Sequence, residues 1–129
     1  MSIKDFASVF IGGGVGAVAR EFLILISNHL LGHNPRAILV ANLTAAFLIG
    51  LAAVLTARNT PHNRLVRLFV VTGILGGLSS FSTLIWSTVE FWSEPHQIWI
   101  GLLYLVLSFG GGWILVELGR RIGQSLSRV

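Results

Sequence analysis

The sequence predicts an all-α membrane protein, a single domain covering residues 1–129 in which four helices cross the bilayer. Hydrophobic residues make up 53% of the chain and charged residues only 11%, against about 25% charged residues in a typical soluble domain. The mean hydropathy is +0.80. Pro35, Pro61 and Pro95 each follow a polar or acidic residue in a gap between apolar segments, as prolines in the first turn of a helix do. These gaps divide the chain into four apolar segments.

The first predicted span runs from Phe6 to His29. Gly12 and Gly16 lie four positions apart on it, a spacing that lets another helix approach closely. Arg20 and Glu21 are charges inside this span, where each costs about 2.5–3.5 kcal/mol on insertion scales. Two interpretations of Arg20 stay open: the pair lies near an interface and reaches the headgroups, or Arg20 faces an aqueous vestibule and attracts anions.

The second predicted span runs from Ala37 to Ala57 and carries Asn42. A buried Asn side chain must use its amide donors and acceptor, because an unpaired polar group in an apolar medium is costly. Asn42 therefore either bonds to another helix or takes the place of water around an ion.

The third predicted span, Leu65 to Phe91, contains the stretch around which the chain is organised. Between Gly73 and Thr83 there are three glycines and four hydroxyl residues in eleven positions. Glycine costs roughly 1 kcal/mol against alanine in a helix, and Ser and Thr compete with the backbone for hydrogen bonds. We expect a non-helical break at Gly76–Ser80. Since freed backbone groups must find partners in lipid, such a break would line a cavity, a pore or an ion site.

The fourth predicted span runs from Ile98 to Leu118 and is followed by a basic tail. Tyr104 and Ser108 are four positions apart and so share one face of this helix. Packing between helices is one use of these hydroxyl groups, and contact with a polar ligand is the other.

The composition excludes several classes of function. Without cysteine there is no disulfide or thiol chemistry, and the four histidines have no metal-ligand spacing. The basic residues lie between the apolar spans, which indicates topology and lipid contact rather than nucleic-acid binding. No catalytic constellation is present, so we expect no enzyme.

One set of polar residues inside the spans consists almost entirely of hydrogen-bond donors, and none of its members is an acid. They are Asn42, Ser79, Ser80, Ser82, Thr83, Tyr104 and Ser108. Donors without carboxylates suit an anion, whereas a cation pathway would use acids or rings of carbonyls. Phe81 joins them, because an aromatic ring edge carries partial positive charge; ordinary packing is its alternative role.

The motif Gly76-Gly77-Leu78-Ser79-Ser80-Phe81-Ser82-Thr83 resembles the signature of the Fluc/CrcB family of fluoride channels. The glycines from Gly12 to Gly16 followed by Arg20, and Asn42-Leu43, are similar to the family's first and second helices, so the resemblance covers the whole chain. It implies an antiparallel, dual-topology dimer in the plasma membrane, which exports fluoride passively through two pores and so relieves fluoride toxicity.

The resemblance also assigns site residues by position. A structural Na⁺ at the dimer centre, which is not transported, would be held by the backbone carbonyls of Gly76 and Ser79. The fluoride pore would be lined by Arg20, Asn42, Phe81, Thr83, Tyr104 and Ser108. The implied partners are the fluoride ion, a second antiparallel subunit and the lipid bilayer, with no nucleic acid.

The chain departs from the family pattern just after this motif. Leu84 stands where the family has a second pore Phe, Ile85 replaces a Ser, and Ser87 replaces a Glu. Because Leu has no positive ring edge, we expect at least one pore built with Leu84 to conduct poorly or not at all.

The basic residues outside the spans are distributed very unevenly. Seven lie on the side that holds both termini, and Arg36 alone lies on the other; the seven are Lys4, Arg58, Arg64, Arg67, Arg120, Arg121 and Arg128. The positive-inside rule then predicts one orientation, with both termini cytoplasmic. A fixed orientation favours one half of a heterodimer, paired with a homologous subunit of opposite orientation, over pairing with itself.

Two other functions remain open at this point. One is a small proton-coupled multidrug exporter that uses Glu21. The other is a non-conducting structural subunit that completes the pore of a heterodimeric fluoride channel.

Overall fold

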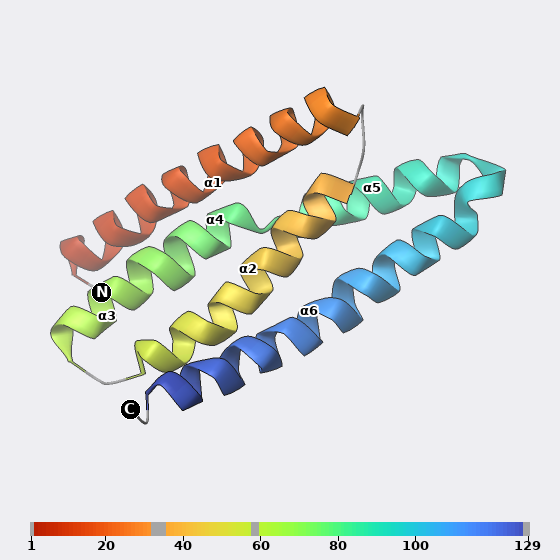
Figure 1. Cartoon of the computed structure of the whole chain (residues 1–129). Coiled ribbons are helices and arrows are strands. Elements are labelled where there is room, and N and C mark those ends of the chain that lie inside the picture. The colour runs from red at the N-terminus through yellow and green to blue at the C-terminus, as the bar shows by residue number, and fades with distance from the viewer. Residues whose placement is uncertain (1, 32–35, 58–59, 128–129) are drawn as a thin grey trace.

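The computed structural model describes residues 2–31, 36–57 and 60–127, and the secondary structure of this part of the chain is helical, joined by short non-helical connections (Figure 1). Pro35, Arg58 and Arg128 lie outside the described residues, as does the side chain of Arg36. The elements in order are α1 (Ile3–Leu31), α2 (Arg36–Leu55), α3 (Pro61–Arg67), the π-helix η1 (Leu68–Leu75), α4 (Gly76–Leu78), α5 (Phe81–Ser93), the 3₁₀ turn η2 (Pro95–Gln97) and α6 (Ile98–Leu126).

Four helical stretches are long and apolar enough to cross a membrane, which confirms the number of spans predicted from the sequence. They cover Ile3–Leu30, Ala37–Leu55, Pro61–Ser93 and Pro95–Leu126. Pro61 begins its helix, with Thr60 as the N-cap: the Thr60 side chain accepts a hydrogen bond from the Asn63 N–H at 3.2 Å.

The fourth helix is longer than predicted, because α6 continues through Arg120 and Arg121 to Leu126. The expectation that the basic residues after Leu118 form a tail is wrong for these two arginines. Glu117 lies three and four residues before them and accepts hydrogen bonds at 2.7 Å from Arg120 Nε and 2.8 Å from Arg121 Nε. Pairs at these spacings support helical structure after the apolar run has ended.

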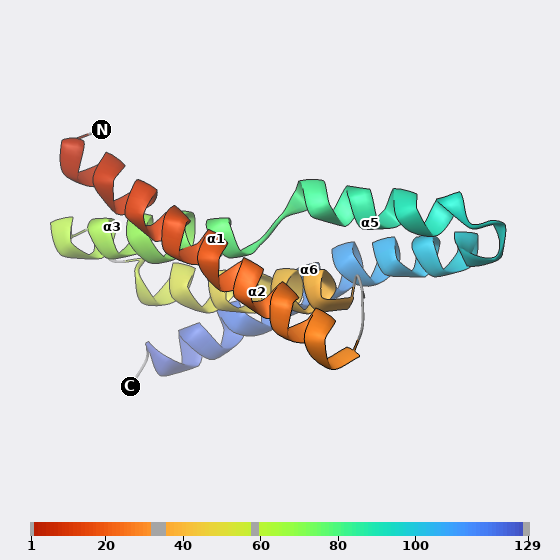
Figure 2. The same ribbon diagram turned by 90° about the horizontal axis from the view of Figure 1, so that it is seen from above.

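The helices pack in pairs. α1 lies along η1 and α4, α2 lies along α6, and α5 packs on the first half of α6. Figure 1 shows the N-terminus, the α2–α3 connection and the C-terminus at one end of the molecule, with the α5–α6 turn at the other. In Figure 2, α1 crosses over the other helices at a marked angle.

Glycines set the distance between the paired helices. A Cβ on Gly12 would collide with the Phe69 carbonyl oxygen, and a Cβ on Gly16 with that of Ile74. The close helix approach predicted for these two glycines is therefore confirmed, with the third helix as the partner. At the α2–α6 contact Gly50 has the same role, since its Cβ would meet the Val116 carbonyl oxygen.

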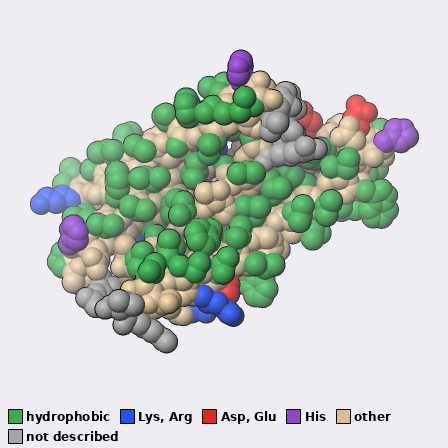
Figure 3. Space-filling model, viewed as in Figure 1, with side chains coloured by type: hydrophobic (Ala, Val, Ile, Leu, Met, Phe, Trp, Pro, Cys, Tyr) green, Lys and Arg blue, Asp and Glu red, His purple; other side chains and the backbone are tan. Residues whose placement is uncertain are grey.

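Little of the apolar surface is buried within this one chain. The buried hydrophobic residues of the described part are Ala41, Ala45, Leu75, Leu78, Leu84 and Tyr104. Large apolar side chains cover most of the face seen in Figure 3, with charged groups near its margins. Such a surface requires lipid or another protein around it.

Candidate functional site

The backbone leaves the helical conformation at Ser79 and Ser80. α4 ends at Leu78, Ser79 has ψ 149°, Ser80 has φ −145° and ψ 109°, and α5 begins at Phe81. The non-helical stretch was expected over Gly76–Ser80, but α4 is helical, so that expectation is wrong for its first three residues. Ser80 caps α5, because its side-chain oxygen accepts a hydrogen bond from the Thr83 N–H at 3.2 Å.

Asn42 of α2 pairs with the backbone of Ser80. The Ser80 N–H donates to Asn42 Oδ1 at 2.8 Å, and Asn42 Nδ2 donates to the Ser80 carbonyl oxygen at 3.3 Å. The interhelical bond, one of the two uses foreseen for Asn42, is therefore present. This pairing uses the side-chain oxygen of Asn42 and one of its two N–H groups; the second N–H does not take part in it.

The backbone carbonyl groups that precede Ser80 lie at the C-terminal end of the helix formed by α3, η1 and α4. The last backbone bond of the series is from Ser79 N–H to the Leu75 carbonyl at 3.1 Å. Among described residues, the carbonyls of Gly76, Gly77, Leu78 and Ser79 receive one hydrogen bond, from Ser79 Oγ to Gly76 at 3.4 Å. These oxygens lie at the end of the helix that carries partial negative charge.

Carbonyl oxygens are hard ligands, which suit a hard cation. The described part of the chain has no group of three His, Cys, Asp or Glu side chains that could hold a metal ion. A cation at this position would therefore depend on backbone and hydroxyl oxygens, and Gly76 and Ser79 are able to offer them.

A line of hydroxyl groups starts at Ser80. Its Oγ lies 2.7 Å from Thr83 Oγ1 and 3.2 Å from Ser82 Oγ. Thr83 and Ser87 are four positions apart, so they share a face of α5, and Ser87 is only 2% exposed. The line thus runs from the Asn42–Ser80 pair into the contact between α5 and α6.

Tyr104 lies at the far end of this line. It is 5% exposed, its ring lies 5.7 Å from that of Phe91, and its buried hydroxyl group has no hydrogen-bond partner in the part of the chain that the structure describes. Ser87 lies close to that hydroxyl, but the pair does not have hydrogen-bond geometry. Ser108 shares the helix face of Tyr104, as predicted, and its hydroxyl donates to the Tyr104 carbonyl oxygen at 2.7 Å.

Two predicted site residues lie apart from this line. Phe81 is 67% exposed at the start of α5, so its ring is free to meet another subunit. Arg20, on α1, has a side chain 24% exposed, and its Nη2 lies 3.5 Å from Glu21 Oε1. The structure thus joins Asn42 and Thr83 through Ser80, and leaves Phe81 and Arg20 outside that network.

Two features of the site were not among the predicted site residues. Ser80 connects Asn42, Thr83 and Ser82, and its place before a helix start, three residues ahead of Thr83, is the signal by which it could have been found. The π-helix η1, which leads into α4, has no such sequence signal. π-helical turns are rare and occur frequently at functional sites.

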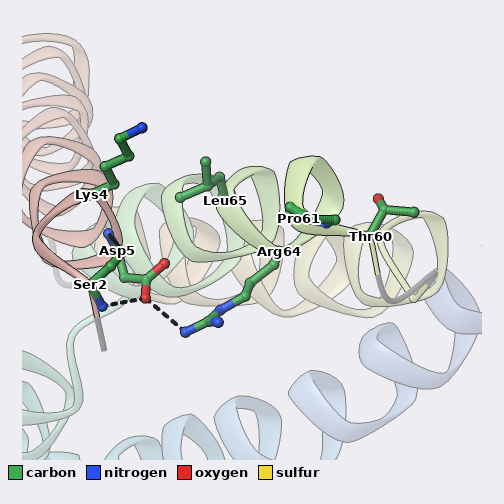
Figure 4. A pocket seen from close by; sticks show the side chains of 7 residues that line it. All are labelled: Ser2, Lys4, Asp5, Thr60, Pro61, Arg64 and Leu65. Atoms are coloured by element: carbon green, nitrogen blue, oxygen red, sulfur yellow. Dashed lines mark hydrogen bonds and ion pairs between the residues drawn. The ribbon is translucent and has the colours of Figure 1, made fainter.

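A separate cleft of about 470 Å³ lies at the end that holds the termini (Figure 4). In it, Arg64 Nη2 lies 2.7 Å from Asp5 Oδ2, and the Ser2 N–H donates to the same oxygen at 2.7 Å. Within the cleft, which Lys4 also lines, Asp5 offsets the charge of Arg64. The ion pair joins the start of α1 to α3.

Comparison with known proteins shows which proteins the chain is similar to. A family model described as "CrcB-like protein, Camphor Resistance (CrcB)" matches residues 7–120. The chain is 44% identical over 115 residues to "Fluoride-specific ion channel FluC 3" of Yersinia pseudotuberculosis serotype I (strain IP32953), covering 89% of this chain and 85% of the relative. It is 33% identical over 116 residues to "Fluoride-specific ion channel FluC" of Serratia proteamaculans (strain 568), covering 90% and 91%. It is 34% identical over 123 residues to "Fluoride-specific ion channel FluC 1" of Staphylococcus aureus (strain NCTC 8325 / PS 47), covering 95% and 99%.

Proposed function

Because the chain belongs to the CrcB family, we propose that it is a subunit of a fluoride-selective channel, through which fluoride leaves the cell passively. The observation that carries this proposal is the line of hydroxyl groups from Ser80 to Tyr104, which contains no acid and ends at a buried, unpartnered hydroxyl. Hydroxyl groups can donate to a small anion that has lost its water.

The proposed pathway uses the residues that the sequence motif indicated. Asn42 offers its remaining N–H, and Thr83 and Tyr104 offer hydroxyl groups along α5 and α6. Ser108 would turn toward the anion the O–H that donates to the Tyr104 carbonyl oxygen in this structure. Phe81, being 67% exposed, offers a ring edge toward a partner subunit. Arg20 would attract anions in a vestibule, and its partly buried guanidinium supports that role over full exposure to lipid.

A structural Na⁺ is part of the proposal. The carbonyls of Gly76 and Ser79 would hold it, and their position at the end of a helix supports this choice. When bound, the ion would supply positive charge that balances the carbonyl dipoles. It would stay in place rather than cross the membrane.

We also propose an antiparallel dimer in the plasma membrane, in which this subunit keeps both termini in the cytoplasm. In the described part of the chain five basic residues lie at the end that holds the termini, whereas Arg36 begins α2 at the opposite end of that helix, in support of one orientation; the five are Lys4, Arg64, Arg67, Arg120 and Arg121. The partner would then be a homologue of opposite orientation. One Yersinia strain holds two of the relatives, named FluC 1 and FluC 3.

Fluoride efflux from liposomes tests the function. The chain is reconstituted alone and together with a homologue whose loop charges are inverted, and released fluoride is measured with an ion-selective electrode, with chloride as the control anion. Fluoride-selective efflux by the pair is expected, and its absence in both preparations would contradict the channel. Robust efflux by the chain alone would contradict the need for a partner.

The two alternative functions predict different effects of single substitutions. A proton-coupled exporter would lose drug resistance with Glu21→Gln, whereas the channel would retain fluoride resistance. The relatives are named as channels, so the exporter is not favoured. A structural subunit without its own pore would leave the flux of the pair insensitive to a change at Phe81.

A further inference from the structure

The hydrogen bonds around Ser80 reveal a competition for one backbone N–H. In an unbroken α-helix each N–H donates to the carbonyl four residues before it. Ser79 still does so, to Leu75 at 3.1 Å. The next bond of the series would join the Ser80 N–H to the Gly76 carbonyl, but Ser80 donates to Asn42 Oδ1 at 2.8 Å instead.

Several features favour the bond from the Ser80 N–H to Asn42 over the helical bond to the Gly76 carbonyl. Its Nδ2 also donates to the Ser80 carbonyl oxygen, so one amide side chain pairs with both polar groups of one residue. Ser80 is 8% exposed, which limits competition from water. The neighbouring Ala41 and Ala45 of α2 are 1% and 0% exposed, and such small buried residues allow α2 to lie close to its neighbours.

This change of hydrogen-bond partner affects the carbonyl group of Gly76. This carbonyl loses the partner that an unbroken helix would provide, and among the described residues its one donor is Ser79 Oγ, at 3.4 Å. That distance is long for an O–H···O bond, which prefers about 2.5–3.0 Å. A carbonyl left this way inside a membrane needs another partner, and a hard cation is one that carbonyl oxygens bind well.

We propose that Asn42 is the positioning residue that keeps the third helix open at Ser79–Ser80 and thereby frees the Gly76 carbonyl for Na⁺. The cation half of this inference rests on the Na⁺ site proposed above. Asn42 acts through the Ser80 N–H and does not touch the ion. Loss of its acceptor oxygen returns that N–H to Gly76 and closes the helix.

The test uses variants that separate the acceptor of Asn42 from its other properties. Asn42→Leu and Asn42→Ala remove the acceptor, the second without adding bulk in case the first does not fold. Asn42→Asp keeps the acceptor and removes the donors. Thr44→Val is the matched control, because Thr44 is an exposed polar residue on the same helix.

Two measurements are made on the full chain with its partner. One is the shift in unfolding temperature between NaCl and N-methylglucamine chloride. The other is the set of ¹³Cα and ¹³Cβ chemical shifts of Ser79 and Ser80, which form the only Ser-Ser pair in the chain and so can be assigned by serine labelling.

Wild type, Thr44→Val and Asn42→Asp should be stabilised by Na⁺ and show extended shifts at both serines. Asn42→Leu and Asn42→Ala should lose the Na⁺-dependent stabilisation and show helical shifts. Extended shifts in both of these variants would overturn the role of Asn42. Absence of Na⁺ stabilisation in wild type would overturn the cation half. Neither measurement uses fluoride flux, so the inference and the channel function can fail separately.

Discussion

Phe81 and Leu84 lie one turn apart on α5, yet Phe81 is 67% exposed while Leu84 is 6% exposed. Leu84 shares the buried side of α5 with Ser87 and Thr88, and α5 packs mainly on α6. Leu84 is therefore held inside its own subunit, and Phe81 is the aromatic residue of this motif that another subunit can reach.

Phe81→Ile should lower fluoride efflux by the reconstituted pair by about tenfold or more, since each ~1.4 kcal/mol of lost ion stabilisation is a factor of ten. Isoleucine keeps an apolar side chain but has no positive ring edge. Phe6→Ile, at a residue 63% exposed near the start of α1, is the control and should leave efflux unchanged. Equal efflux by wild type and Phe81→Ile would favour the non-conducting structural subunit.

Leu84→Phe should destabilise the protein even though it restores the aromatic residue of the family pattern. The position is buried, and enlarging a residue in a filled site typically costs about 1–3 kcal/mol. Thermal unfolding in detergent measures the effect. Ile85→Phe, at a residue 40% exposed, should change the unfolding temperature much less; a tolerant Leu84→Phe variant would mean that space remains beside α6.

Tyr104→Phe should lower fluoride transport without lowering the stability of the protein. The hydroxyl group has no hydrogen-bond partner among the described residues, so removing it should leave the unfolding temperature unchanged or slightly raised. If the hydroxyl binds fluoride in transit, efflux should nevertheless fall. Unchanged efflux at unchanged stability would remove Tyr104 from the pathway.

Gly16→Ala and Gly14→Ala form a matched pair on α1. The added Cβ of Gly16→Ala would meet the backbone of Ile74, which cannot rotate away, so we expect a loss on the order of 1–3 kcal/mol. A Cβ on Gly14 has no neighbour within 4 Å, and alanine should add up to about 1 kcal/mol of helix stability there. Equal unfolding temperatures for the two variants would contradict the close α1–η1 packing.

The absence of cysteine from the chain allows a direct test of orientation. Ser127→Cys lies just after α6 and Ser93→Cys at the end of α5, on opposite ends of the molecule. In intact cells a membrane-impermeant maleimide should label Ser93→Cys and leave Ser127→Cys unlabelled. Comparable labelling of both variants would show dual orientation and argue against a fixed heterodimer.

The sequence by itself determined the four spans and the close approach at Gly12 and Gly16. These properties are local: a run of apolar residues is stable in lipid wherever it lies in the fold, and a glycine always lacks the Cβ that would hold a neighbouring helix away. The run of hydroxyl residues from Ser79 to Thr83, with no acid among them, is likewise visible in the sequence alone.

Only the tertiary structure decided which polar groups meet. Asn42 and Ser80 are 38 positions apart, and their pairing depends on how α2 lies against the third helix. The same holds for Leu84, whose burial depends on the elements packed around α5 rather than on its own neighbours in sequence. Hydrogen bonds and burial depend on distances between helices, and those distances are set by packing along the whole length of each pair.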